Sequence, residues 1–62
     1  MKLEQLLSTI RGIETIEIVR LSDREDFIYH GSKANFDSSE FKNCEVISVM
    51  PLYDVELGIT IQ

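Results

Sequence analysis

The chain is poor in several residue types, and each shortage excludes a class of protein. Its 62 residues include one cysteine, which cannot form an internal disulfide, whereas secreted domains of this size usually depend on about two to four disulfides. No apolar run approaches the ~18 residues of a membrane-spanning helix, and the opening MKLEQLL lacks the long apolar stretch of a signal peptide. We therefore predict a protein of the reducing cytoplasm that does not enter a membrane.

Basic residues are also scarce. Six lysines and arginines stand against eleven acidic residues, for a formal net charge of −5 and an isoelectric point near 4.6. Phosphate backbones and anionic lipid surfaces repel a chain of this charge, so direct binding to nucleic acid is disfavoured. At this length we expect one domain, residues 1–62, with a thin hydrophobic core.

Motifs that carry chemistry are missing. The three glycines are isolated, so there is no phosphate-binding loop. One cysteine and one histidine cannot by themselves supply the ligands of a structural zinc site. The carboxylates of Asp23, Glu25 and Asp26 lack the spacing and central glycine of an EF-hand. We therefore expect no catalytic residue, no cofactor and no metal.

The first predicted element is an amphipathic helix. Between Leu3 and Ile10, four apolar residues recur at i, i+3, i+4 and i+7, which places them on one helical face. Gly12 is the residue type that commonly ends a helix by adopting a left-handed conformation. The helix should therefore end near Ile10 or Arg11.

Two strands should follow the helix. The segment from Ile13 to Leu21 is rich in β-branched residues, but its apolar positions change parity between Ile18 and Val19. Either a bulge or burial of both faces explains that change. After a polar loop over residues 22–26, Phe27 to Tyr29 predicts a second strand that pairs antiparallel with the first.

A short second helix is predicted from a capping pattern. Asp37 and Glu40 have the spacing of a capping box, and Phe36 and Phe41 have that of a hydrophobic staple. A helix of one or two turns should therefore begin at Ser38.

The C-terminal third predicts a strand pair. Glu45 to Leu52 forms the third strand, in which Pro51 is tolerated near the end. Val55 to Ile61 alternates between apolar and polar residues and forms the fourth, after a reversal at Tyr53 and Asp54. The expected fold class is α+β in the order α-β-β-α-β-β, a four-stranded antiparallel sheet with the N-terminal helix on one face.

Such a sheet has a second face that needs cover. The third strand carries apolar residues of both parities, with Val46 and Met50 on the same one. One short helix covers part of one face, and small domains often bury the rest by self-association. We predict a symmetric homodimer through the sheet face or an edge strand, with Val19, Val46 and Met50 near the contact. Alternatively, the second helix and the loop around Phe36 cover that face.

The C-terminal hairpin is purely anionic. No basic residue follows Lys42, and Asp54 and Glu56 lie two residues apart, on one face of a strand. They form either an ordinary solvated face that discourages aggregation or a surface offered to a basic groove on a partner protein. A second acidic group lies in the other hairpin, with Asp23, Glu25 and Asp26.

Several segments carry a family resemblance. The opening MKLEQLLSTI, the strand TIEIV, the ending FIYHG with Tyr29 and Gly31, and the segment CEVISVMPLYDVELGITI resemble small proteins of unknown function encoded by phages and prophages of Gram-positive bacteria. Phage genes of this size often encode inhibitors of host defence, including anti-CRISPR proteins, and several of those are acidic proteins that occupy nucleic-acid-binding grooves. The resemblance implies no catalytic residues.

Two functional hypotheses follow. The first is a non-enzymatic, phage-derived module that acts in the host cytoplasm and inhibits a nucleic-acid-handling or defence protein, such as a CRISPR effector nuclease. It would place Asp54 and Glu56, and the acidic residues of the other hairpin, in a basic groove. The second is an oligomer that binds a small molecule or nucleotide, or a small enzyme, with a site between subunits around His30 and Tyr29.

Overall fold

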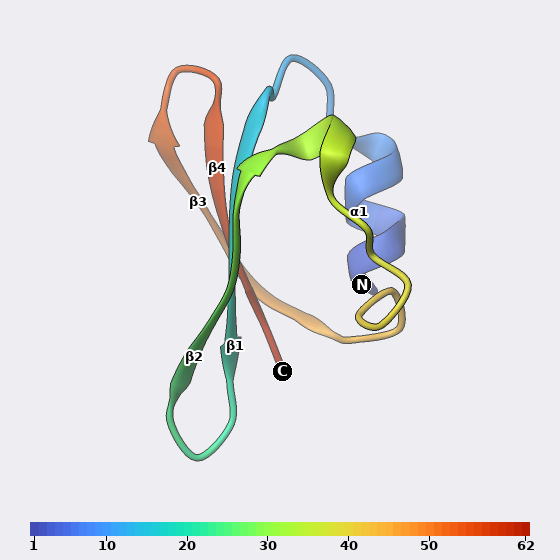
Figure 1. Cartoon of the computed structure of the whole chain (residues 1–62), viewed down its shortest axis with the longest axis vertical. Coiled ribbons are helices and arrows are strands. Elements are labelled where there is room, and N and C mark those ends of the chain that lie inside the picture. The colour runs from blue at the N-terminus through green and yellow to red at the C-terminus, as the bar shows by residue number, and fades with distance from the viewer.

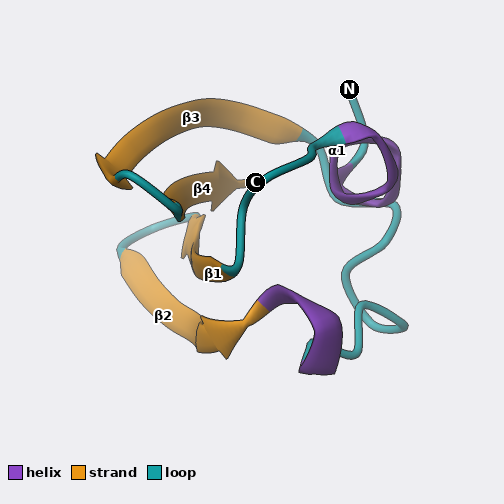
Figure 2. Ribbon diagram, turned by 90° about the horizontal axis from the view of Figure 1, so that it is seen from above, coloured by secondary structure: helices purple, strands orange, loops and turns teal.

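A computed structural model describes all residues, 1–62. The helix and the four predicted strands are confirmed, with shifted boundaries. The elements are α1 (Leu3–Thr9), β1 (Thr15–Leu21), β2 (Glu25–Ser32), the 3-10 helix η1 (Lys33–Asn35), β3 (Val46–Tyr53) and β4 (Glu56–Ile61). Figure 1 shows α1, η1 and the connection to β3 on one side of the sheet, and Figure 2 shows the same arrangement from above.

Helix α1 forms as its apolar spacing predicts. It ends at Thr9, just before the expected residues, and Ile10 already has an extended backbone. Gly12 then adopts a positive φ of +76°, the conformation in which a glycine suits a chain reversal. Leu3 and Leu6 are buried, and Leu7 and Ile10 pack against the core. The helix therefore contributes its apolar face to the core.

The predicted all-antiparallel sheet is wrong at its centre. The strand order is β2-β1-β4-β3, and β1 pairs with β4 in parallel, while β1–β2 and β3–β4 are antiparallel. The reason lies in the long connection after β2, which carries the chain to the far edge of the sheet. From there β4 returns beside β1, so that both run in the same direction (Figure 1).

The core lies between α1 and the two central strands. Its six buried side chains are Leu3, Leu6, Ile16, Ile18, Ile59 and Ile61. We call the side of the sheet that carries these isoleucines the inner face. None of the helices is long and apolar enough to cross a membrane.

The expected helix at Ser38 is wrong. Asp37 accepts hydrogen bonds from the Ser39 amide, at 3.0 Å, and from the Ser39 hydroxyl, rather than pairing with Glu40. This carboxylate closes an Asx turn that could also begin a helix, but the Lys42 and Cys44 carbonyls accept from the Glu4 and Leu3 amides, which holds the end of the segment against the N-terminus. Residues 39–43 form turns instead.

Phe36 and Phe41, the expected staple pair, pack against the core as half-buried side chains. The aromatic ring of Phe36 also contacts Tyr29, with ring centroids 4.8 Å apart. Both phenylalanines thus cover the inner face. They do not cover the other side of the sheet, which was the alternative to a dimer.

The parity change in β1 arises because the strand carries apolar residues on both faces, and not from a bulge in β1 itself. Ile18 pairs with Tyr29 but Val19 pairs with Phe27, so Ile28 of β2 is the extra residue of a bulge. The β1 strand itself keeps alternating, with Ile16 and Ile18 buried and Val19 half-buried toward the opposite side. The bulge is therefore in the partner strand. The β2 strand also begins at Glu25, which shortens the expected loop to residues 22–24.

The N-terminal residues are fixed to the segment before β3. Lys2 forms an isolated bridge with Glu45, and the Leu3 amide donates to the carbonyl of Cys44. The ammonium group of Met1 donates to the Glu45 carboxylate, and this hydrogen bond lowers the pKa of that exposed carboxyl below its ordinary value.

Candidate functional site

The side of the sheet opposite α1 carries no helix or loop (Figures 1 and 2), and we call it the open face. Strand pairing places on it Glu17, Val19, Leu21, Glu25, Phe27, His30, Ser48, Met50, Tyr53, Glu56, Gly58 and Thr60. A shallow depression of about 160 Å³ lies on this face and includes Glu17, Glu25, Met50 and Leu52 in its lining.

Large apolar side chains on the open face are exposed to solvent. The exposed fraction is 67% for Phe27, 59% for Met50 and 75% for Tyr53. Leu21 and Leu52 add further exposed apolar surface. An apolar group gathered on one face of a small protein marks an interaction surface more often than scattered residues do.

All formal charge on the open face is negative. Glu17, Glu25 and Glu56 lie there, while Arg20, the one lysine or arginine within the four strands, pairs with Ile61 and so belongs to the inner face. No basic residue of the sheet therefore neutralises these carboxylates. His30 is the only side chain on the face that can acquire a positive charge.

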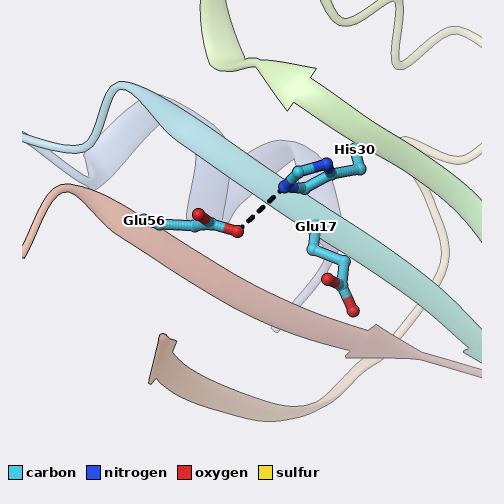
Figure 3. A group of neighbouring side chains, drawn as sticks. All are labelled: Glu17, His30 and Glu56. Atoms are coloured by element: carbon cyan, nitrogen blue, oxygen red, sulfur yellow. Dashed lines mark hydrogen bonds and ion pairs between the residues drawn. The ribbon is translucent and has the colours of Figure 1, made fainter. Parts of the chain in front are cut away.

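Three of these residues form a compact group. The His30 Nε2 lies 2.9 Å from Oε2 of Glu56, and one ligand atom from each of Glu17, His30 and Glu56 falls within 4.8 Å of the others. Figure 3 shows the imidazole and the Glu56 carboxylate directed toward each other, with Glu17 beside them. We call this group the Glu-His-Glu cluster.

Sheet register brings the cluster together. Glu17 of β1 pairs directly with His30 of β2, and Glu56 of β4 pairs with Thr15, one outward position before Glu17 on β1. Each member therefore comes from a different strand. Sequence reasoning singled out His30 and Glu56 separately and missed Glu17. The sequence did contain a signal for Glu17. It lies between two core residues, Ile16 and Ile18, so its side chain points to the opposite face of the strand.

The cluster is only partly shielded from solvent. The exposed fraction is 48% for the His30 side chain and 16% for that of Glu56. The Glu17 side chain is half-buried, and its carboxylate makes no hydrogen bond or ion pair within the chain. Two carboxylates and one imidazole can bind a cation or move a proton, but none of the three is a hydroxyl or thiol nucleophile.

Tyr29 and His30, the residues predicted near a site between subunits, lie on opposite faces of the edge strand β2. Tyr29 pairs with the buried Ile18 on the inner face, and its hydroxyl donates to the Ser32 carbonyl at 2.7 Å. Neighbouring residues of a strand point to opposite sides of the sheet, so His30 is on the open face. Within one chain the two side chains are therefore separated by the sheet, and a site that uses both would have to form at the β2 edge.

The predicted partner-binding residues lie at the two ends of the sheet. Asp54 is in the turn between β3 and β4, and Asp23 is in the turn between β1 and β2, at the opposite end in Figure 1. Glu25 and Glu56 are on the open face. Asp26 pairs with Arg20 and forms an ion pair with Arg24 at 3.3 Å. Asp26 thus points away from the other acidic side chains.

The three predicted dimer residues do not share a face. Val19 and Met50 are on the open face, but Val46 pairs with Ile61 and packs against the core. The expectation that Val46 and Met50 face the same way is wrong because β3 has a register shift after Val46, with Ile47 as the extra residue. A bulge reverses which parity faces the core.

No protein-family model, curated protein or solved structure is significantly similar to this chain. The physical properties of the open face therefore carry the functional argument.

Proposed function

We propose that this protein is a non-enzymatic binding module that places its open face against a basic surface of a partner protein. Given the resemblance to small phage proteins, we propose as partner a nucleic-acid-handling or defence protein of the host, such as a CRISPR effector nuclease, inhibited in the host cytoplasm. The observation that carries the proposal is the combination on one face of exposed apolar side chains with exclusively negative formal charge.

The apolar residues would supply the affinity. Aromatic residues and methionine are enriched at the centres of protein interfaces, where their burial releases water from apolar surface. Phe27, Met50 and Tyr53 are more than half exposed in the isolated chain. Each can therefore still lose apolar surface to a partner.

The carboxylates would supply the choice of partner. A groove that binds nucleic acid is lined with lysine and arginine, and complementary charge accelerates association and rejects wrong partners. Glu25 and Glu56 lie on the open face, and Asp54 lies at the tip of the β3–β4 hairpin. No lysine or arginine of the strands lies on this face, so none would repel the basic residues of such a groove.

A second copy of the chain is the competing occupant. Stacking two open faces would bring Glu17, Glu25 and Glu56 close to their counterparts, and like charges at an interface are unfavourable. A homodimer that buries Val19 and Met50 therefore requires high salt or an offset through an edge strand. Light scattering at low salt should then report the 7.1 kDa monomer.

A nucleotide site around His30 has less support. Glu17 and Glu56 lie beside the imidazole and would repel a phosphate group. The same carboxylates attract cations.

The test measures binding to purified effector nucleases, together with inhibition of cleavage. The double variant Glu25→Lys with Asp54→Lys should weaken binding by at least about tenfold at low salt, since each reversed charge removes roughly a kcal/mol or more. The matched control, Glu4→Lys with Glu40→Lys, changes the net charge equally at exposed sites outside the open face. If the two double variants weaken binding equally, the acidic residues of the open face do not select the partner. If Phe27→Ser and Met50→Ser leave binding unchanged, the open face is not the surface that contacts the partner.

A further inference from the structure

We propose that Glu17, His30 and Glu56 form a binding site for a divalent transition-metal ion, with Zn²⁺ as the preferred ion. The site shares Glu56 with the proposed docking surface, but binding of the ion does not require the partner protein. The observation behind it is the convergence of one imidazole nitrogen and two carboxylate oxygens, all within 4.8 Å of one another, on the open face (Figure 3).

The donor set selects the class of metal. Mg²⁺ and Ca²⁺ prefer oxygen ligands alone, whereas an imidazole with carboxylates suits Zn²⁺ and its first-row neighbours. Ligand distances of about 2.0–2.2 Å to a tetrahedral Zn²⁺ put neighbouring ligand atoms roughly 3.3 Å apart. The His30 and Glu56 atoms are already 2.9 Å apart, so the main adjustment is a rotation of Glu17.

The framework of the site is rigid. Glu17 is on β1, His30 on β2 and Glu56 on β4. In the whole sheet β1 and β4 are the central strands, and they carry the buried core isoleucines. We therefore expect metal binding to order the side chains without moving the strands. Sites built on sheet strands hold their geometry more accurately than sites on loops.

Charge also favours a cation at this position. Two glutamates lie close together with no lysine or arginine of the strands on their face, and the Glu17 carboxylate has no hydrogen-bond or ion-pair partner. A divalent ion would balance both carboxylates. Because half of the His30 side chain is exposed, the remaining coordination position faces solvent and can hold water or a ligand from another molecule.

The experiment titrates the full chain, freed of metal with a chelator, with Zn²⁺ by calorimetry and with Co²⁺ by absorption. We expect binding of one ion per chain and, for Co²⁺, the visible bands of tetrahedral coordination. His30→Gln, Glu17→Gln and Glu56→Gln should each weaken Zn²⁺ binding by at least about tenfold, since even loss of an outer-shell partner costs about 10–100-fold. Circular dichroism verifies that each variant is folded.

Two controls separate this site from other binding. Glu25→Gln removes a carboxylate from the same face outside the cluster, and Cys44→Ser removes the only thiol. Both should bind Zn²⁺ like the parent chain. The proposal is overturned by the absence of Zn²⁺ binding, by loss of binding in Cys44→Ser, or by dependence on His30 alone. It is equally overturned if Ca²⁺ binds as tightly as Zn²⁺.

Discussion

His30 and Glu56 form a side-chain hydrogen bond, 2.9 Å from Nε2 to Oε2, although their strands are not neighbours in the sheet. The β1 strand lies between β2 and β4, whose backbones are thus roughly 10 Å apart. Both side chains project from the open face and meet above β1 (Figure 3). The contact exists only because β4 inserts beside β1. The Glu-His-Glu cluster is therefore a direct consequence of the sheet order.

The two faces of the sheet should respond differently to truncation. Ile18 is completely buried, so Ile18→Val should lower the free energy of unfolding by about 0.5–1.5 kcal/mol. Phe27 is 67% exposed on the open face, so Phe27→Ala should change it by less than about 1 kcal/mol despite the larger deletion. Urea unfolding measures both. A larger loss for Phe27→Ala would mean that the open face is covered in solution.

Gly12 should tolerate substitution poorly for conformational reasons alone. No atom lies within 4 Å of the point that a Cβ would occupy at this residue, but φ is +76°. Gly12→Ala should therefore cost roughly 1 kcal/mol of stability, because alanine is strained in the left-handed region. Gly12→Asn should cost less, since asparagine visits that region more readily. Thermal unfolding compares the two variants, and equal losses would contradict a conformational origin.

Gly31 and Tyr29 should be energetically coupled. A Cβ at Gly31 would lie 2.9 Å from the Tyr29 hydroxyl, which donates to the Ser32 carbonyl. Gly31→Ala should thus displace the tyrosine ring and lower stability by about 1–3 kcal/mol. Tyr29→Phe removes the hydroxyl, so Gly31→Ala should be less harmful in that background. A double-mutant cycle by thermal unfolding measures the coupling, and additive effects would exclude the contact.

Asp37 should make stability depend on acid pH. The hydrogen bond from the Ser39 hydroxyl, and then that from the Ser39 amide, lower the pKa of Asp37 below its usual 3.8. A pKa lowered by folding adds stability above the unfolded pKa, and this stability is lost as the pH falls through the folded pKa.

Asp37→Ala should therefore be less stable than the parent chain near neutral pH, and the difference should shrink near pH ~2. NMR titration of the side-chain carboxyl measures the pKa directly, and Glu40→Ala serves as a control without such hydrogen bonds. A difference in stability that persists unchanged in acid would contradict the ionised turn.

Local sequence patterns determined the elements of this protein. The apolar spacing between Leu3 and Ile10 specified a helix because residues one turn apart share a face, and the alternation up to Ile61 specified a strand. Gly12 marked the end of the helix because glycine readily adopts the positive φ of the residue that follows a helix. These signals succeeded because each depends on residues that are close in the chain.

Only the tertiary structure decided the sheet order, the bulges and the cluster. The parallel pairing of β1 with β4 joins segments about forty residues apart, as in the contact of Ile18 with Ile59, and no local pattern encodes such a partner. The bulges at Ile28 and Ile47 changed which side chains face the core, because one extra residue reverses the parity of a strand. The segment after Asp37 forms turns and not a helix, and the carbonyls of Lys42 and Cys44 near its end accept from the N-terminal amides of Glu4 and Leu3. Glu17, His30 and Glu56 became neighbours because strand pairing, a long-range interaction, sets the distance between side chains on different strands.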